Sequence, residues 1–138
     1  MLKKKIKQED DFGCGVACTA KALNISYIKS LSLFSNGKFR ASHNGFLCEG
    51  IKIALSKKGK KYDYYYSNNK LRRQIYSNGT IVFIKRSKKY PSGHYLYRDN
   101  EKWMDPWINF AENKNIKYAI AGYRNRLPSG AIYTIIRN

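Results

Sequence analysis

One stretch of the sequence decides the predicted fold: Gln8-Glu9-Asp10-Asp11-Phe12-Gly13-Cys14-Gly15-Val16-Ala17-Cys18. A glutamine stands six residues ahead of a cysteine, and good helix formers continue from Cys14 to Leu23. Cys14, Ala17 and Cys18 fall at helical spacing, and Asn24 is suited to end the helix. The first turn of a helix has unpaired amide donors and partial positive charge, which together stabilise a thiolate. The stretch therefore predicts an activated thiol at Cys14.

Gln8 and the other two cysteines receive different interpretations. The side-chain amide of Gln8 is placed to donate to a developing oxyanion, beside the backbone amide of Cys14. Cys18 lies one turn deeper on the same helix face, and Cys48 falls within an apolar helical pattern. Because free cysteine is among the most buried residue types, we interpret both as core thiols.

Helical patterns come first along the chain and strand patterns second. Beyond the first helix, helices are predicted over 27–34, 45–58 and 69–76, with a break at Ser35-Asn36-Gly37. Strands are predicted over 62–66, 80–84, 94–98, 101–105, 118–122 and 131–136. This order predicts an α+β fold with N-terminal helices packed on a C-terminal antiparallel sheet. No linker or repeat interrupts the 138 residues, so we expect one domain over 1–138.

A histidine and an aspartate occur in a predicted hairpin within Gly93-His94-Tyr95-Leu96-Tyr97-Arg98-Asp99-Asn100-Glu101-Lys102-Trp103-Met104-Asp105-Pro106. With Asp99-Asn100 as a two-residue turn, Arg98 lies opposite Glu101 and His94 lies opposite Asp105. Directly opposed residues have Cβ atoms roughly 5 Å apart on one face of the sheet. Asp105 would then orient His94, and His94 would pair with the thiolate of Cys14.

The composition is strongly basic, with 27 Lys and Arg against 9 Asp and Glu and a formal charge of +18. Such an imbalance predicts attraction to anions, whether nucleic acid, acidic membrane or acidic peptide. The tyrosines within 62–66 lie beside Lys57 to Lys61 and Arg72-Arg73, an interleaving that suits nucleic-acid binding. We prefer the interpretation that these residues form a solvated basic face, with ordinary core tyrosines beneath it. A nucleic-acid-binding module stays an alternative.

Several features bear on location. Acidic residues 9–11 follow the basic Met1 to Lys7, where a signal peptide would have its apolar region. No apolar run approaches the roughly 20 residues of a transmembrane span. Three cysteines are an odd number, which argues against a disulfide framework. We therefore expect a cytoplasmic protein.

A zinc site is a further alternative. Cys14-x3-Cys18 together with His43-x4-Cys48 offers three thiols and an imidazole, the ligand number of a structural zinc. That interpretation leaves Gln8, His94 and Asp105 without a role.

The residues that carry chemistry resemble a known family. Gln-x5-Cys-Gly before an apolar helix, Gly-His on a strand and Asp-Pro on the next resembles the bacteriocin-processing cysteine peptidases. These are papain-like double-glycine leader peptidases, often fused to export ATPases. One departure is Gly13, which stands where the family often has an acidic residue or asparagine.

The resemblance implies a papain-like fold and a cysteine peptidase acting on a peptide or protein, without cofactor or metal. It makes Cys14 the nucleophile, His94 the base, Asp105 the orienting residue and Gln8 part of the oxyanion hole. The same triad also serves acyl transferases and transglutaminases, so that reaction stays an alternative.

Overall fold

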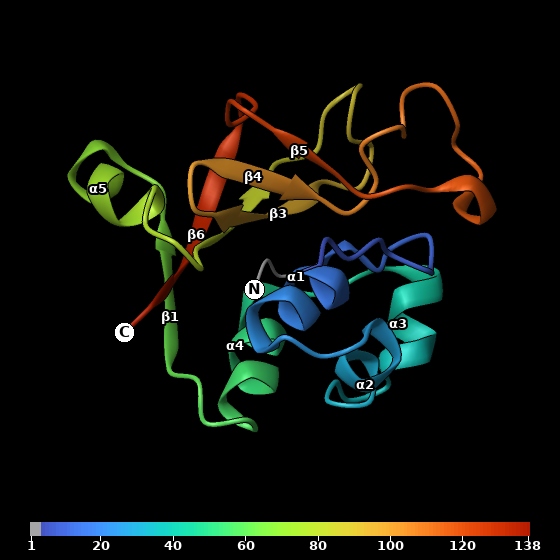
Figure 1. Cartoon of the computed structure of the whole chain (residues 1–138), viewed down its shortest axis with the longest axis horizontal. Helices are drawn as coiled ribbons and strands as arrows, with labels where there is room; N and C mark the ends of the chain where they lie inside the picture. Colours follow the sequence, from blue (N-terminus) through green and yellow to red (C-terminus); the bar gives the residue numbers. More distant parts are fainter. Residues whose placement is uncertain (1–3) are drawn as a thin grey trace.

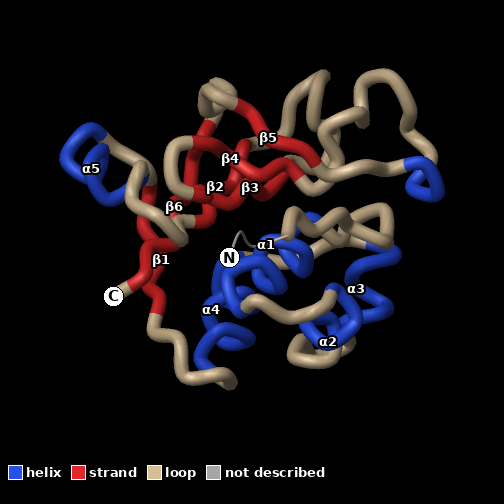
Figure 2. Tube along the Cα trace, viewed as in Figure 1, coloured by secondary structure: helices blue, strands red, loops and turns tan. Residues whose placement is uncertain are grey.

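The computed structural model describes residues 4–138, in which a layer of helices packs against a twisted sheet (Figure 1). The helical layer contains α1 (Cys14–Leu23), α2 (Tyr27–Leu31), α3 (Gly37–His43) and α4 (Cys48–Ser56). Figure 2 shows these helices beneath the strands, with the short helix α5 (Arg72–Ile75) at one end of the sheet. Short 3-10 helices occupy Asn69–Leu71 and Ile116–Tyr118.

Six strands form a sheet in the order β1-β6-β2-β3-β4-β5, and every paired neighbour is antiparallel. The strands are β1 (Tyr62–Tyr66), β2 (Ile81–Ile84), β3 (His94–Asp99), β4 (Lys102–Asp105), β5 (Gly122–Arg124) and β6 (Ala131–Arg137). The predicted α+β class with helices packed on an antiparallel sheet is therefore confirmed.

The main core lies between the helices and one sheet face. It joins apolar residues of α1 and α4, such as Val16 and Ile51, to Tyr95, Tyr97 and Met104 of the central strands. A smaller apolar cluster on the opposite face contains Leu96, Trp103 and Ile75 of α5. This alternation along β3 and β4 places neighbouring residues on opposite faces, as strand geometry requires.

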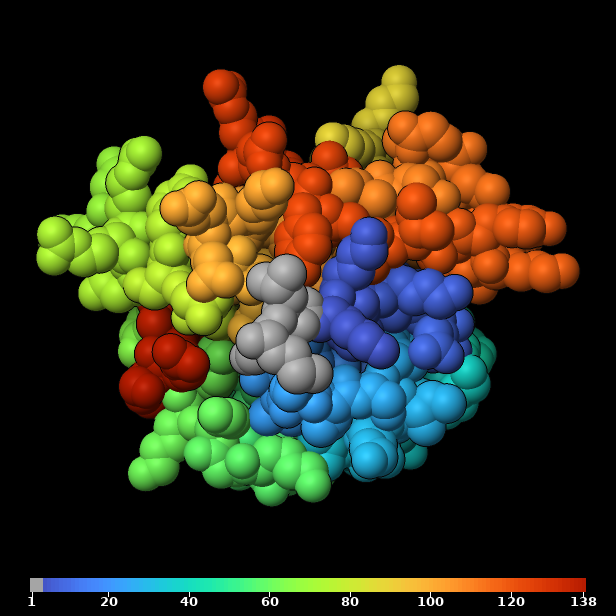
Figure 3. Space-filling view, viewed as in Figure 1, coloured from blue at the N-terminus to red at the C-terminus, as the bar shows by residue number. Residues whose placement is uncertain are grey.

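The N-terminal segment lies along the seam between the two layers (Figure 3). The backbone N–H of Gln8 donates to Pro106 O at 3.1 Å, beyond the end of β4. The N–H of Phe12 donates to Ala41 O at 2.8 Å, in α3. The segment that leads to Cys14 is thus held by both layers.

Some predicted elements differ from the structure. Helix α1 has the predicted bounds, and Asn24 ends it in a left-handed conformation with φ 57°. Helix α3 was not predicted, because Gly37–His43 buries only Gly37 and Ala41 and so lacks an apolar period. The predicted helix over 45–58 begins later, at Cys48, and ends at Ser56.

The predicted strand over 118–122 is wrong, since the strand in this region is Gly122–Arg124. A 3-10 turn at Ile116–Tyr118 precedes it, and the Asn115 side chain accepts a hydrogen bond from Lys117 N at its start. This local side-chain bond competes with strand formation, which the apolar residues before Gly122 had suggested.

The predicted hairpin register is also wrong. Asp99 pairs with Lys102 and Tyr97 with Met104, so the turn residues are Asn100 and Glu101. Asn100 adopts φ 58°, a left-handed conformation that asparagine tolerates. Each partner is displaced by two residues, and the same register extended puts Leu96, not His94, opposite Asp105. A displacement of two keeps every side chain on its face, so His94 and Asp105 meet diagonally.

Candidate active site

Cys14 is the first residue of α1 and is half-buried against the sheet. The backbone N–H of Tyr95 in β3 donates to its Sγ at 3.4 Å. The glycines on either side of Cys14 leave no room for a side chain: a Cβ on Gly13 would lie 2.0 Å from the Tyr27 hydroxyl. A Cβ on Gly15 would lie 3.0 Å from Ile51 and 3.3 Å from Tyr95. The helix start is therefore packed tightly enough to fix the sulfur.

His94 is the first residue of β3 and is buried beside the same sulfur. Its Nε2 bonds to Asp105 Oδ1 at 2.6 Å, which leaves Nδ1 for the thiol side. Gly93 precedes it with φ +75°, and a Cβ there would lie 2.2 Å from the Phe83 ring. The Tyr90 ring stacks on the imidazole with a 5.0 Å centroid distance and a 5° interplanar angle. Backbone and ring contacts together restrict the orientation of His94.

Asp105 is fully buried and accepts from three donors. Besides His94, the backbone N–H of Trp107 donates to Oδ1 at 2.9 Å, and Arg124 Nε donates to Oδ2 at 2.8 Å. A carboxylate without water must be satisfied in this way, since an unpaired buried charge is costly.

These contacts favour charged forms of both His94 and Asp105. Burial alone lowers the pKa of His94, but the charge and hydrogen bond of Asp105, with contacts to Cys14, raise it to about 10. Burial raises the pKa of Asp105, but His94, the Trp107 amide and Arg124 lower it to about 2. An imidazolium–carboxylate pair therefore persists across neutral pH.

Gln8 is 2% exposed and lies in the wall of the same cleft. Its Nε2 donates to Asp10 O at 3.0 Å and to Asp11 O at 3.2 Å. Its Oε1 is buried without a hydrogen-bond partner among the described residues. Both amide hydrogens are thus engaged, and Nε2 must release one carbonyl before it donates to another acceptor.

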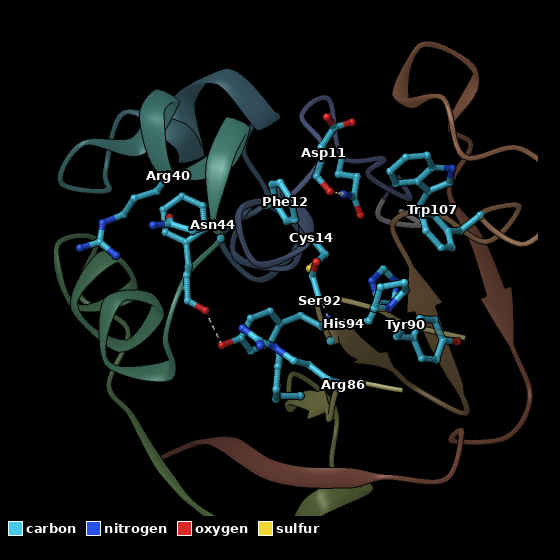
Figure 4. A pocket seen from close by; sticks show the side chains of 18 of the residues that line it. Asp11, Phe12, Cys14, Arg40, Asn44, Arg86, Tyr90, Ser92, His94 and Trp107 are labelled. Atoms are coloured by element: carbon cyan, nitrogen blue, oxygen red, sulfur yellow. Dashed lines mark hydrogen bonds between the residues drawn. The ribbon is translucent and has the colours of Figure 1, made fainter. Parts of the chain in front are cut away.

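A cleft of about 590 Å³ separates the helical side from the sheet side. Figure 4 shows Cys14 between Phe12, Arg40 and Asn44 on one side and His94 on the other. The lining is rich in aromatic rings: Phe12, Phe46, Phe83, Tyr90, Tyr95, Trp107 and Phe110. Besides His94, its charged members are the cations Arg40, Arg86 and Lys114 and the acidic Asp11.

The other two cysteines lie away from this arrangement. Cys18 is fully buried, and burial raises the pKa of its thiol. Burial also raises the pKa of Cys48, whose Sγ lies 3.7 Å from the Tyr95 hydroxyl. Both contribute to the main core, as predicted.

The residues of the zinc alternative do not converge. Over residues 4–138, no group of three or more His, Cys, Asp or Glu side chains is placed to hold a metal ion. His43 is exposed, and its Nδ1 lies 2.8 Å from Phe39 O one helical turn away. In the same described part of the chain, no helix has the length and apolar character to cross a membrane.

The structure thus places Gln8, Cys14 and His94 in the wall of one cleft, with Asp105 buried behind His94, and adds two residues that were not predicted. Arg124 lies in β5, whose bounds were predicted wrongly, so it fell outside the expected sheet. Tyr90 lies in the turn before β3, and its stacking on His94 has no signal in residue spacing. A correct strand at 122–124 would have placed Arg124 beside β4.

The chain has a papain-like fold. Among solved structures, the chain resembles the peptidase domain of Streptococcus ComA, a bifunctional ABC transporter involved in a quorum-sensing pathway. The TM-score is 0.58 at 19% identity, over 99% of this chain and 98% of that domain. No protein-family model and no curated protein matches the sequence.

Proposed function

We propose that this protein is a cysteine peptidase that acts through Cys14, His94 and Asp105. The observation that carries the proposal is the position of His94, which lies between the Cys14 sulfur and a fully buried carboxylate 2.6 Å away. The papain-like fold, shared with a peptidase domain over nearly the whole chain, supports it.

The geometry supports a two-stage acyl transfer. The Cys14 thiolate attacks the peptide carbonyl carbon and forms a tetrahedral intermediate. His94 donates its Nδ1 proton to the departing amine, and the C–N bond breaks to leave a thioester on Cys14. His94, now neutral, accepts a proton from water, whose oxygen attacks the thioester carbon. The C–S bond then breaks, which releases the acid product and returns the Cys14 thiolate beside protonated His94. Asp105 keeps the Nε2–H in place throughout.

The oxyanion has two sources of donors. The backbone N–H groups of the first turn of α1 have no partner within the helix, and they lie beside the sulfur. Gln8 supplies the second source when Nε2 leaves its longer bond, the one to Asp11 O at 3.2 Å. The bond to Asp10 O then holds the amide plane in position.

The cleft lining and the fold match favour a peptide substrate of a particular kind. Aromatic rings favour apolar side chains, and the exposed cations Arg40, Arg86 and Lys114, which outnumber the acidic Asp11 in the lining, favour acidic ones. Cleavage of a leader peptide agrees with the motif resemblance and with the likeness to the ComA peptidase domain. We therefore propose an acidic, apolar leader peptide as the substrate.

Incubation with a peptide library, analysed by mass spectrometry, tests this function. We expect cleavage by the native protein, with acidic peptides preferred, and none by Cys14→Ala. An Arg40→Glu, Arg86→Glu double variant should lose the acidic preference. Lys58→Glu with Lys70→Glu changes the charge equally outside the cleft and should keep it. Absence of cleavage together with transfer to an added amine would replace hydrolysis by acyl transfer; activity retained in Cys14→Ala would refute the proposal.

A further inference from the structure

The buried carboxylate of Asp105 uses its two oxygens for different partners. Oδ1 accepts from His94 Nε2 at 2.6 Å and from the Trp107 N–H at 2.9 Å. Oδ2 accepts from Arg124 Nε at 2.8 Å. The guanidinium therefore occupies the oxygen that the imidazole does not use, and a rotation of the carboxylate would break both charged contacts together.

The sheet register places Arg124 in a defined position beside Asp105. Gly122 of β5 lies directly opposite Asp105, and Arg124 lies opposite Trp103. Arg124 is therefore a diagonal neighbour of Asp105 on the same face, as His94 is from the other adjacent strand. The carboxylate lies between two cations supplied by the strands on either side of β4.

Other groups complete the surroundings of this carboxylate. Burial raises the pKa of Tyr90, the charge of Arg124 lowers it and that of Asp105 raises it, and the Tyr90 ring stacks on His94. Contacts with Cys14 raise the pKa of His94, and burial raises the pKa of Cys18, with smaller contributions from Cys14 and Asp105. Arg124 is the cation in this group that does not take part in proton transfer. Its side chain is 25% exposed, whereas that of Asp105 is 0% exposed.

We propose that Arg124 is a positioning residue that fixes the second oxygen of Asp105 and thereby the orientation of His94 toward Cys14. This role rests on the proposed function, because it concerns the same reaction. A purely structural ion pair would affect the free energy of unfolding alone. A positioning role also affects the reactivity of Cys14 and the pH range over which the His94–Asp105 bond persists.

Two variants and a matched control test the role. Arg124→Gln removes the charge, and Arg124→Lys keeps it without the planar guanidinium. Arg126→Gln removes an equal charge from an exposed position two residues away. The readouts are the rate of Cys14 alkylation by iodoacetamide across pH and the ¹⁵N spectrum of the histidines, of which the chain has only 2. Neither readout needs a peptide substrate.

We expect Arg124→Gln to lower the alkylation rate of Cys14 about tenfold at neutral pH, as loss of an orienting partner commonly does. Arg124 is among the groups that lower the pKa of Asp105, so its loss should raise that pKa. The His94 signal should then report loss of the Asp105 bond at a higher pH than in the native protein. The alkylation rate and the His94 titration of Arg124→Lys should lie between those of Arg124→Gln and of the native protein. Arg126→Gln should match the native protein.

A folded Arg124→Gln variant with native alkylation and a native His94 titration would overturn the proposal. If Arg124→Gln does not fold, the test uses Arg124→Lys. Native alkylation of Cys14 and a native His94 titration in that variant would equally refute positioning by the guanidinium. Failure of the peptidase function would look different. In that case the native protein itself would alkylate Cys14 no faster than Cys18 and Cys48.

Discussion

Two buried carboxylates lie beside the cleft, and they are held in different ways. Asp10 is 6% exposed and bonds to the Tyr27 hydroxyl at 2.8 Å and to Lys38, whose side chain is 75% exposed. Asp105 is fully buried, and its partners His94 and Arg124 lie largely within the sheet. Asp10 supports the turn that leads to Cys14, since its carbonyl also accepts from Gly13 N. Asp10 thus lies at the turn before Cys14, the proposed nucleophile, whereas Asp105 holds His94, the proposed base.

The difference lies in which partners solvent can replace. Water readily substitutes for an exposed lysine, so an ion pair of the Asp10 kind contributes little net free energy. Asp105 has no exposed surface, so each lost donor leaves its buried charge with fewer partners. We therefore expect changes at Asp105 to affect chemistry strongly, and changes at Asp10 to affect it weakly.

The largest effect should follow from Asp105→Asn. The amide has the size of the carboxylate but no charge, so the pKa of His94 should fall and the imidazole should lose its fixed orientation. We expect peptide cleavage to fall by about 10³-fold to 10⁴-fold. The measurement is kcat/KM for the best peptide from the library, with Asp99→Asn as a control outside the cleft. A change below tenfold would mean that Asp105 does not orient the base.

Gln8→Ala should have the next largest effect, and it separates the oxyanion role from thiol activation. An oxyanion donor acts only in the transition state, so kcat should fall by about 10²-fold to 10³-fold. The rate of Cys14 alkylation should change little, because no oxyanion forms on carbon in that reaction. Equal losses in the two measurements would instead show that Gln8 only supports the turn at Asp10 and Asp11, whose carbonyls it binds.

The sequence predicted the residues of this site better than the geometry that joins them. Cys14 at a helix start and His94 and Asp105 on adjacent strands follow from local patterns, and α1 and β1 have their predicted bounds. The hairpin turn was misplaced because Asp99-Asn100 and Asn100-Glu101 are both acceptable turn pairs. The left-handed φ of Asn100, with its N–H bonded to Asn78 Oδ1, depends on a segment 22 residues away. The His94–Asp105 contact survived because strand faces repeat every two residues.

The second partner of Asp105 could not be predicted in the same way. Arg124 is one of 27 basic residues, and only the pairing of β4 with β5 distinguishes it from the others. Similarly, the Tyr27–Asp10 bond joins residues 17 apart through the packing of α2 on α1. Local patterns identify groups that can react, whereas tertiary pairing decides which groups support them.

The pH dependence of unfolding should show an effect of Asp105 that is of intermediate size. The pKa of Asp105 is lowered to about 2, below the ~3.9 of an unfolded aspartate, so its stabilisation is present above pH 4 and lost as pH falls toward 2. We expect the free energy of unfolding in urea at pH 6 to be about 2 kcal/mol higher for the native protein than for Asp105→Asn. At pH 2 the difference should shrink, and a difference independent of pH would contradict the assigned ionisation.

The raised pKa of His94 gives the free energy of unfolding the opposite dependence on pH. Because a raised histidine pKa favours the folded protein below about 6.5, its contribution should decline as pH rises toward 10. Urea unfolding of native protein and His94→Gln at pH 6 and pH 10 measures this decline. The two groups together predict a stability plateau between about pH 4 and pH 6.5, bounded by Asp105 on the acid side and His94 on the alkaline side.

The smallest effect should follow from Asp10→Asn. The asparagine can still accept from the Tyr27 hydroxyl, while the pair with Lys38 loses its charge. Because Lys38 is mostly exposed, we expect Cys14 alkylation to stay within about threefold of the native rate and the thermal midpoint to fall by about 5 °C or less. Lys38→Gln removes the same ion pair from its exposed side and should match Asp10→Asn in both measurements. A tenfold loss of alkylation in Asp10→Asn alone would mean that the charge of Asp10, not its hydrogen bond to Tyr27, places the nucleophile, and the two carboxylates would then share one role.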